Sequence, residues 1–547
     1  MVSKHGIDRY KDLREAIASQ VVKYRTQDIR IIGGDERSPV DWLFDFRSLL
    51  LQPKWLDRYA EIFWEHYASH YPFQVCGMET AAISLVAAIV MKGVQRGTPV
   101  NGVYTRKSRK RQGMLRQIEG TLNGNPIILV DDLIHSGSTF DKQLKILSDV
   151  NAHVSDIFVL TAFRDISTYR FPLAPDIRIK HLFTLQDFGL PMEKVKSEEN
   201  LDAFETLWRF QAPNPLYNIV LEKSAPVIDD QRIYFGADNG IFYALKQSDG
   251  SIDWTYTIKK GGETNSIFSS PLLHKGILYF GASDGSVYAL DAATGGKRWE
   301  YSGADWVRSS PALNTKQGVI YIGMEFGLLG KQGCLVALDA KTGMQRWRSP
   351  IRAAVQSSPL FIGREDLVVI GDSDGIIHAY DASSGALRWQ YGTEGPIYGS
   401  FVYDTLRRLI CFGSSDGTLY ALFAFDGSPV FAKDSTINIH STPIIHDRVL
   451  YFSSLDKKLY AINLDTGEDM WSFATKGRIF CSPTFIDGSI WIGSNDGRVY
   501  GLDPTLGFQK SFFQASERIV NKLVWNEKTK RFFLPTHANQ ILCLVRK

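Results

Sequence analysis

Two adjacent carboxylates followed by a loop of small residues are the strongest chemical signal in the sequence. Residues 127–139, IILVDDLIHSGST, run from four apolar residues through Asp131 and Asp132 to a light loop, and a helix is expected from Phe140. Small residues before a helix let backbone N–H groups converge on a phosphate. Paired carboxylates can accept hydrogen bonds from two ribose hydroxyls and help to hold Mg²⁺. A turn or helix cap is the alternative, but this order of elements favours a cradle for ribose 5-phosphate.

A second segment concentrates positive charge. Five cations stand within six residues, and Gly113 follows them; the cations are Arg106, Lys107, Arg109, Lys110 and Arg111. We expect a mobile loop that closes over an anion such as a departing pyrophosphate, because fixed cations stabilise charge that develops in the transition state. A solvated basic loop or a nucleic-acid patch is the alternative, although no aromatic residues are interleaved for base stacking.

The elements that must position these segments alternate between helix and strand. Helices are expected near 56–69 and after Glu79, and strands at 72–77, 100–105 and 127–130. Such alternation predicts an α/β domain with a mostly parallel sheet. Ligands of these sheets gather at the carboxyl ends of the strands, where the acid pair falls.

Four stretches, in order, resemble orotate phosphoribosyltransferases, a branch of the type I phosphoribosyltransferases. They are FDFRSLLLQPKWLDRYAEIF, VCGMETAAISLVAAIV, TRKSRKRQGMLRQIEG and the stretch 127–139, and the resemblance covers nearly all of 35–165. It implies transfer of ribose 5-phosphate from phosphoribosyl pyrophosphate (PRPP) to a nitrogenous, pyrimidine-like base, with Mg²⁺ as cofactor and release of pyrophosphate. It also implies a homodimer, in which the cationic loop reaches the neighbouring subunit.

The resemblance assigns a role to each motif. Asp131 and Asp132 would hold the ribose hydroxyls and meet Mg²⁺ indirectly, through PRPP. Lys110, with Arg106 and Lys107, would act on the pyrophosphate, and Arg164 would approach the base. The 5-phosphate loop would comprise His135, Ser136, Gly137, Ser138 and Thr139, and the pyrophosphate loop Cys76, Gly77, Met78, Glu79, Thr80 and Ala81.

The sequence departs from this family at four places. Gln112 stands where His or Tyr is usual, and His135 stands where Thr is usual. Glu79 occupies a position where the family has an aromatic or other non-acidic residue. The lysine of a KSG turn is missing from IIGGDERSP, where Arg37 is the available substitute. A PRPP-binding regulator that has lost transfer is therefore an alternative function.

From about residue 225 the sequence repeats a unit of about 42 residues. The clearest copy, SSPLLHKGILYFGASDGSVYALDAATGGKRWEYS, begins at Ser269, and seven others begin near Ser224, Ser309, Ser357, Gly399, Ser441, Cys481 and Asn521. Four short strands per unit are typical of a β-propeller blade. The eighth copy lacks its fourth strand, so we predict that 216–223, LYNIVLEK, closes an eight-bladed ring. The chain would then divide into an α/β domain, 1–212, and an all-β propeller, 213–547.

The repeats resemble those of the pyrroloquinoline-quinone (PQQ) dehydrogenase and outer-membrane assembly protein superfamily, through the pattern YALDAxTGxxxW. PQQ itself is not expected, because the dehydrogenases use a vicinal cysteine pair that is missing here. A protein or small-molecule ligand would meet the residues that precede the repeated Ser-Ser-Pro step: Phe268, Arg308, Gln356, Tyr398, His440 and Phe480. Alternatively, the residue type at these positions varies only because exposure to solvent permits it.

Composition limits the remaining possibilities. The 547 residues carry a formal charge of +3, which gives no support for a polyanion-coated surface. The five cysteines lie far apart with no CxxC, so a reducing compartment fits best. With no apolar span of bilayer length, we expect a cytoplasmic protein without membrane or nucleic-acid partners. Because a nucleotide-forming enzyme needs no propeller, a sensor-effector of stress or phage defence, gated through the propeller, is a further alternative.

Overall fold

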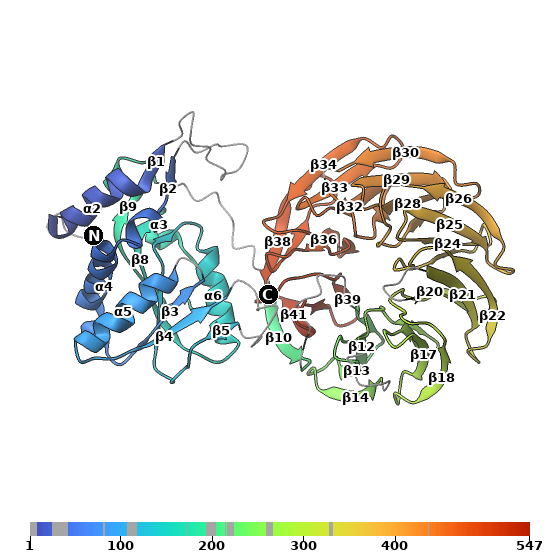
Figure 1. The fold of residues 1–547 in the computed structure, drawn as a ribbon, viewed down its shortest axis with the longest axis horizontal. Helices are drawn as coiled ribbons and strands as arrows, with labels where there is room; N and C mark the ends of the chain where they lie inside the picture. The colour runs from blue at the N-terminus through green and yellow to red at the C-terminus, as the bar shows by residue number, and fades with distance from the viewer. Residues whose placement is uncertain are drawn as a thin grey trace. The chain divides into compact units, whose positions relative to one another are not determined.

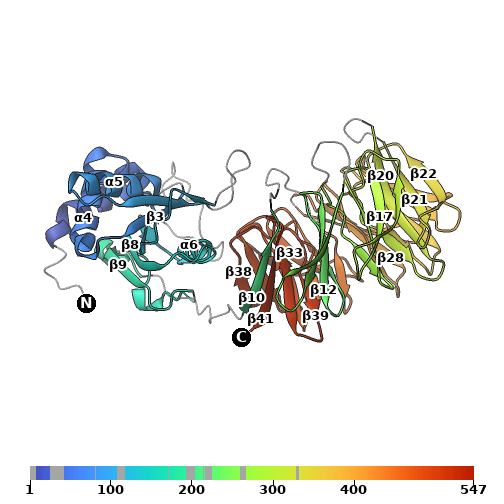
Figure 2. The same ribbon diagram turned by 90° about the horizontal axis from the view of Figure 1, so that it is seen from below.

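The computed structural model describes residues 8–24, 42–79, 82–106, 117–171, 173–192, 204–213, 215, 224–258, 266–327, 332–435 and 437–547. The chain forms two compact units, Met1–Glu199 and Asn200–Lys547 (Figures 1 and 2). The predicted division at 212/213 falls later than this one, because a propeller strand precedes it. No helix in the described part of the chain is long and apolar enough to cross a membrane.

The first unit is built on a seven-stranded sheet with the order β5-β4-β3-β6-β8-β7, in which β9 also pairs with β8. All its strand pairs are parallel except β4–β5. The predicted α/β domain with a mostly parallel sheet is therefore confirmed. The strands are β3 (Gln74–Met78), β4 (Asn101–Thr105), β5 (Ile118–Glu119), β6 (Ile127–Val130), β7 (Leu133–Ile134), β8 (Val154–Ala162) and β9 (Arg178–Thr184), and a separate antiparallel pair comprises β1 (Val22–Tyr24) and β2 (Trp42–Phe44).

Helices cover both faces of this sheet. The α-helices are α2 (Lys11–Ala16), α3 (Arg47–Leu50), α4 (Pro53–Tyr67), α5 (Ala82–Gln95) and α6 (Ser138–Ser148); the short helices are η1 (Asp8–Tyr10), η2 (Ile17–Val21), η3 (Ala68–His70), η4 (Ile166–Thr168) and η5 (Leu185–Phe188). In β6, Ile128 and Val130 pack with α4 and α5, whereas Ile127 and Leu129 pack with α6. Alternate residues of one strand thus enter two cores, which explains why the whole run IILV is apolar.

The second unit contains eight four-stranded sheets, so the predicted eight-bladed propeller is confirmed. Blade 1 has β11 (Val227–Ile228), β12 (Arg232–Gly236), β13 (Ile241–Lys246) and β14 (Ile252–Thr257); blade 2 has β15 (Leu272–His274), β16 (Ile277–Gly281), β17 (Ser286–Asp291) and β18 (Lys297–Ser302); blade 3 has β19 (Ala312–Asn314), β20 (Val319–Phe326), β21 (Gln332–Asp339) and β22 (Gln345–Ile351); blade 4 has β23 (Leu360–Ile362), β24 (Leu367–Gly371), β25 (Ile376–Asp381) and β26 (Leu387–Gly392). Blade 5 has β27 (Val402–Asp404), β28 (Leu409–Gly413), β29 (Thr418–Phe423) and β30 (Pro429–Asp434); blade 6 has β31 (Ile444–His446), β32 (Val449–Ser453), β33 (Lys458–Asn463) and β34 (Asp469–Ala474); blade 7 has β35 (Thr484–Ile486), β36 (Ser489–Gly493), β37 (Arg498–Leu502) and β38 (Gln509–Gln514); blade 8 has β39 (Val524–Asn526), β40 (Arg531–Pro535), β41 (Gln540–Arg546) and β10 (Phe204–Gln211).

The two serines of the Ser-Ser-Pro step have different structural roles. The first serine stabilises its own blade: the Gly281 N–H donates to Ser269 Oγ at 3.0 Å. The second serine joins neighbouring blades: the Ser270 N–H donates to Ser310 Oγ, and the Ser310 N–H donates to Ser358 Oγ, both at 2.9 Å. The repeated hydroxyls therefore satisfy buried backbone groups at the centre of the ring, where strand pairing cannot.

A tryptophan in the outermost strand joins each of several blades to the next one. Trp299 Nε1 donates to the Ala340 carbonyl at 3.0 Å, for example. In blade 8 the same bond runs from Trp208 Nε1 in β10 to the Gln247 carbonyl, at 3.0 Å. β10 pairs antiparallel with β41 and so provides the missing fourth strand. This corrects the prediction that 216–223 closes the ring; that segment lies outside the described residues.

Candidate functional site

The acid pair lies at the carboxyl edge of the parallel sheet, directly after β6. The Asp131 N–H donates to the Phe158 carbonyl at 3.2 Å, and the Asp132 carbonyl accepts from the Leu160 N–H at 3.0 Å. The neighbouring strand β8 therefore holds the backbone of both acids beyond the end of β6. Both side chains remain partly exposed, so a ligand at this edge can reach them.

Burial raises the pKa values of two groups at this edge, Asp132 and Tyr59. It raises the pKa of Asp132, while the Leu133 N–H, the Asp131 side chain and the charge of Arg47 oppose the rise. Beneath the pair, the Tyr59 hydroxyl donates to the Asp131 carbonyl at 3.4 Å. Burial, followed by the two aspartates, raises the pKa of Tyr59 well above its usual value, so it remains a neutral donor. Ligand hydroxyls or a cation would favour the charged form of Asp132.

The predicted 5-phosphate loop connects β7 to α6. Gly137 has φ +84° and caps α6, and a Cβ there would lie 3.4 Å from the Tyr169 ring and 3.5 Å from the Phe171 ring. Only glycine adopts this conformation without strain. The hydroxyls of Ser136 and Ser138 are 3.0 Å apart, and both side chains are accessible in part. The loop thus directs the N-terminal turn of α6 and two hydroxyls to one place, as an anion site requires.

Tyr169 supports this loop by hydrogen bonding, and no sequence motif pointed to it. Its hydroxyl lies 2.9 Å from the carbonyls of both Ile134 and His135 and can donate to either. The Arg164 N–H donates to the same hydroxyl at 3.3 Å. Arg164 follows β8, next to the strand that carries the acids, so the structure brings the predicted base residue to the edge of the acid pair. Local patterns could not reveal Tyr169, because its contacts depend on how the chain folds back after β8. The exposed His135 ring lies 5.3 Å from the Phe163 ring.

The predicted pyrophosphate loop is partly a buried strand. Cys76, Gly77 and Met78 belong to β3, and burial raises the pKa of the Cys76 thiol to about 12, which makes it chemically inert. A Cβ on Gly77 would clash with Ala82, so glycine is what lets α5 begin against β3. The predicted members Thr80 and Ala81 lie outside the described residues.

Glu79 and Arg106 form an ion pair. Arg106 Nη1 donates to Glu79 Oε2 at 2.6 Å, and its Nε donates to Glu119 Oε1 at 2.9 Å. The predicted pyrophosphate-binding Arg106 is thus held between two carboxylates, and the unusual Glu79 has a cationic partner. Lys107, Lys110 and Gln112 lie outside the described residues.

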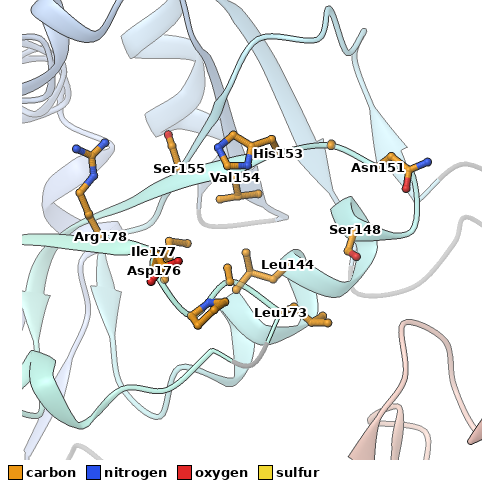
Figure 3. Close-up of a pocket in the computed structure, with 13 residues that line it drawn as sticks. Leu144, Ser148, Asn151, His153, Val154, Ser155, Leu173, Asp176, Ile177 and Arg178 are labelled. Carbon is orange, nitrogen blue, oxygen red and sulfur yellow. The ribbon is translucent and has the colours of Figure 1, made fainter. Parts of the chain in front are cut away.

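The cavity of about 530 Å³ shown in Figure 3 is lined by none of the predicted phosphoribosyl-site residues. Leu144 and Ser148 of α6 line it, together with His153 and Val154 at the start of β8 and Arg178 at the start of β9. In a parallel sheet these are the amino ends of the strands, opposite to the edge that carries the acid pair. The Arg178 guanidinium pairs with the buried Asp156 at 2.8 Å.

The six predicted ring residues of the propeller lie just before successive inner strands; we call them the mouth ring. Their members are Phe268, Arg308, Gln356, Tyr398, His440 and Phe480. The His440 ring lies 4.9 Å from the Tyr398 ring and 6.0 Å from the Phe480 ring. Burial lowers the pKa of His440 to about 4, so it is neutral at pH 7. Part of the mouth ring is therefore a continuous aromatic arc.

Curated relatives match the first unit. Orotate phosphoribosyltransferase of Bradyrhizobium sp. (strain BTAi1) is 27% identical over 125 residues, 22% of this chain and 68% of the relative. Orotate phosphoribosyltransferase of Pyrococcus furiosus is 28% identical over 162 residues, 28% of this chain and 84% of the relative. The N-terminal region therefore resembles these enzymes at low identity.

Solved structures match the second unit in fold. BamB of Moraxella catarrhalis gives a TM-score of 0.51 at 19% identity and covers 62% of this chain and 99% of that one. Quinohemoprotein alcohol dehydrogenase of Comamonas testosteroni gives a TM-score of 0.53 at 15% identity, with 63% and 77% covered. The sequence profile of the family described as outer membrane protein assembly factor BamB matches residues 201–364 and 373–511, more than half of the chain. Through its propeller, this chain belongs to that family, and its N-terminal unit resembles orotate phosphoribosyltransferase.

Proposed function

We propose that the N-terminal unit is a Mg²⁺-dependent phosphoribosyltransferase that moves ribose 5-phosphate from PRPP to a pyrimidine-like base. The observation that carries the proposal is the placement of the acid pair and the Gly137 loop at the carboxyl edge of a parallel sheet. The likeness to orotate phosphoribosyltransferases supports the same assignment.

In the proposed reaction, a base nitrogen attacks C1 of the ribose, and the C1–O bond to pyrophosphate breaks. The bond's electron pair leaves with pyrophosphate, and the base nitrogen loses any proton that it carries. Asp131 and Asp132 would hold the ribose hydroxyls, and Ser136, Ser138 and the first N–H groups of α6 would hold the 5-phosphate. Catalysis would arise from positioning and electrostatics, without a protein nucleophile.

The carboxylates at this edge fit Mg²⁺, which prefers oxygen ligands and commonly shares one or two carboxylates with substrate phosphates. Among the described residues, no group of three or more acidic, histidine or cysteine side chains could hold a metal ion alone. Oxygens of PRPP would therefore complete the coordination. The bound cation would neutralise charge on the leaving pyrophosphate.

The ion pair of Arg106 favours one alternative. Because Glu79 and Glu119 both accept from Arg106, its charge is offset before any pyrophosphate binds. A regulator that binds PRPP without transfer would tolerate this arrangement better than an enzyme. A sensor-effector role, in which a propeller ligand gates the first unit, is the other alternative; the fused architecture motivates it.

The test is to incubate the full chain with PRPP, Mg²⁺ and a panel of bases, and to measure pyrophosphate release and PRPP binding. The proposal expects base-dependent release that is lost in the Asp131→Asn, Asp132→Asn double variant. Tight PRPP binding without release for every base would instead establish the regulator. Release that requires an added propeller ligand would establish gating. Gel filtration in the same buffers tests the proposed homodimer.

A further inference from the structure

Blade 3 departs from the repeat at the mouth ring. Its second strand, β20, has eight residues, whereas β16 of blade 2 and β24 of blade 4 have five. The extension carries Glu325, whose N–H donates to the Trp306 carbonyl at 2.9 Å. The same backbone bond joins Ser283 to Ser266 in blade 2, which identifies the equivalent position in each blade. The other seven blades place there Asp238, Ser283, Ser373, Ser415, Leu455, Asn495 and His537.

The Glu325 side chain is buried in the mouth of the propeller unit. The residue is 0% exposed, and neither carboxylate oxygen has a hydrogen-bond partner among the described residues. The acid at the equivalent position of blade 1, Asp238, accepts instead from the Asn539 side chain. An unpaired buried carboxylate destabilises the fold, and seven blades form without one. Glu325 is therefore explained better by a ligand than by folding.

Polar groups of the mouth ring surround this carboxylate. The charge of Arg308 and the side chain of Gln356 both lower the pKa of Glu325, against the effect of burial. Among the described residues, no ion pair within 4.0 Å joins Arg308 to Glu325. Arg308 Nε is itself buried without a hydrogen bond in the described part of the chain. Its guanidinium lies 4.9 Å from the centre of the Trp306 ring.

Trp306 is also particular to blade 3. In six of the other blades, the residue three places before the first serine of the repeated step, or before its equivalent, is small, polar or basic: Ser266, Ala354, Pro396, Asn438, Arg478 and Arg518. Trp306 and Glu325 thus differ from the equivalent described residues of the other blades, and Trp306 contacts both Glu325 and Arg308.

Another arc of the same mouth is apolar. Tyr398, His440 and Phe480 follow one another in blades 5 to 7 with their rings in contact. Leu455, Phe480 and Val520 form a small buried cluster of their own. The channel mouth therefore combines a hydrogen-bonding arc from blades 3 and 4 with an aromatic and aliphatic arc.

We propose that this mouth binds a planar heterocycle of the nucleobase class, with its polar edge toward Arg308, Gln356 and Glu325. A guanidinium donates, a carboxylate accepts, and an amide does both, which complements the mixed donors and acceptors of a base edge. Aromatic side chains bind base faces. An anion would be repelled by Glu325 and a cation by Arg308, so a neutral planar ligand suits both. Arg308 and Gln356 are partly exposed and meet it first. The inference goes beyond the proposed function and does not depend on transfer.

The experiment measures binding by titration calorimetry on the full chain carrying Asp131→Asn and Asp132→Asn, which weaken the first-unit site. The probes are uracil, cytosine and adenine, and then their nucleoside 5′-monophosphates. We expect at least one base to bind with one site per chain. Arg308→Ala and Gln356→Ala, each made separately, should weaken binding at least tenfold. The control Arg298→Ala removes an exposed arginine from β18, the outermost strand of blade 2, and should change binding less than twofold.

Comparison of free bases with their monophosphates tests the preference for a neutral ligand: a free base should bind more tightly than its anionic monophosphate, and tighter binding of every monophosphate would overturn the proposal. The two variants guard against a folding defect, because both residues are partly exposed and each is checked by thermal melting. The proposal is overturned if none of the probes binds at millimolar concentration, or if binding survives both substitutions. It is also overturned if PQQ, a planar polyanion, binds there more tightly than every base. Pyrophosphate release is not part of this readout, so the proposed function can fail independently.

Discussion

Replacing Glu325 by glutamine should stabilise the propeller at alkaline pH and leave it nearly unchanged in acid. Burial raises the pKa of Glu325 from 4.5 to about 7, although Arg308 and Gln356 act in the opposite direction. Below pH 4.5 the carboxyl is protonated in the folded and the unfolded protein, and the pKa difference contributes nothing. Between pH 4.5 and pH 7 the unfolded chain releases this proton while the folded protein still holds it, so stability falls as pH rises and levels off above pH 7, where the folded protein carries the buried charge as well.

The magnitude follows from the two pKa values. A difference of about 2.5 between them corresponds to about 3 kcal/mol of unfolding free energy, fully lost above pH 7. Glutamine has nearly the same shape and does not titrate. For a unit of 348 residues, residues 200–547, an unfolding entropy of about 2 cal/mol/K per residue converts this loss to roughly 4 °C in Tm.

The assay is scanning calorimetry of the full chain and of Glu325→Gln at pH 5 and pH 8. Other titrating groups are common to both proteins, so the Tm difference between them isolates Glu325. We expect that difference to grow by roughly 4 °C in favour of the variant between the two pH values. A Tm difference that is the same at pH 5 and pH 8 would refute the account of a buried, unpaired carboxylate.

Three further predictions concern other parts of the molecule. Gly137→Ala should weaken PRPP binding, measured by calorimetry. The control Gly97→Ala, also at positive φ but with open space around it, should lower stability by about 1 kcal/mol and leave PRPP binding unchanged. Equal losses of PRPP binding in the two variants would count against the assigned role of the Gly137 loop. Glu79→Gln removes one of two carboxylates from Arg106 and should tighten pyrophosphate binding about threefold to tenfold, measured by competition with PRPP; weaker binding would exclude this role. Trp208→Phe removes the hydrogen bond that ties β10 to blade 1 and should lower the unfolding free energy by about 1 kcal/mol in a denaturant titration; no loss would mean that this bond does not stabilise closure.

The blades could be predicted because each is a local unit whose contacts repeat. The serines of Ser-Ser-Pro and the tryptophans occupy the same places in successive copies, and their hydrogen bonds recur with them. The prediction placed the closing strand at 216–223, the apolar run directly before the first copy, whereas the structure uses β10, which lies further upstream. The signal for it was Trp208, which fills the tryptophan position of blade 8 within FETLWRFQ.

Some residues of the candidate site could likewise be predicted from the sequence, and others could not. Asp131, Asp132 and Gly137 were accessible from sequence because strand, acids, loop and helix are contiguous. The pairing of Arg106 with Glu79 was not, because the two come from different strand ends that meet only in the folded sheet. Glu325 could not be recognised either, since its lack of a hydrogen-bond partner among the described residues depends on how blades 3 and 4 pack around it.

The central claim is that the acid pair and the Gly137 loop cradle the ribose 5-phosphate of PRPP during transfer. Its most direct test is mass spectrometry of the product formed by the full chain from PRPP, Mg²⁺ and a base panel. The account predicts a base joined to ribose 5-phosphate, formed by the wild type and absent with the Asp131→Asn, Asp132→Asn variant. The same product from both proteins, or none from the wild type with any base, would contradict it.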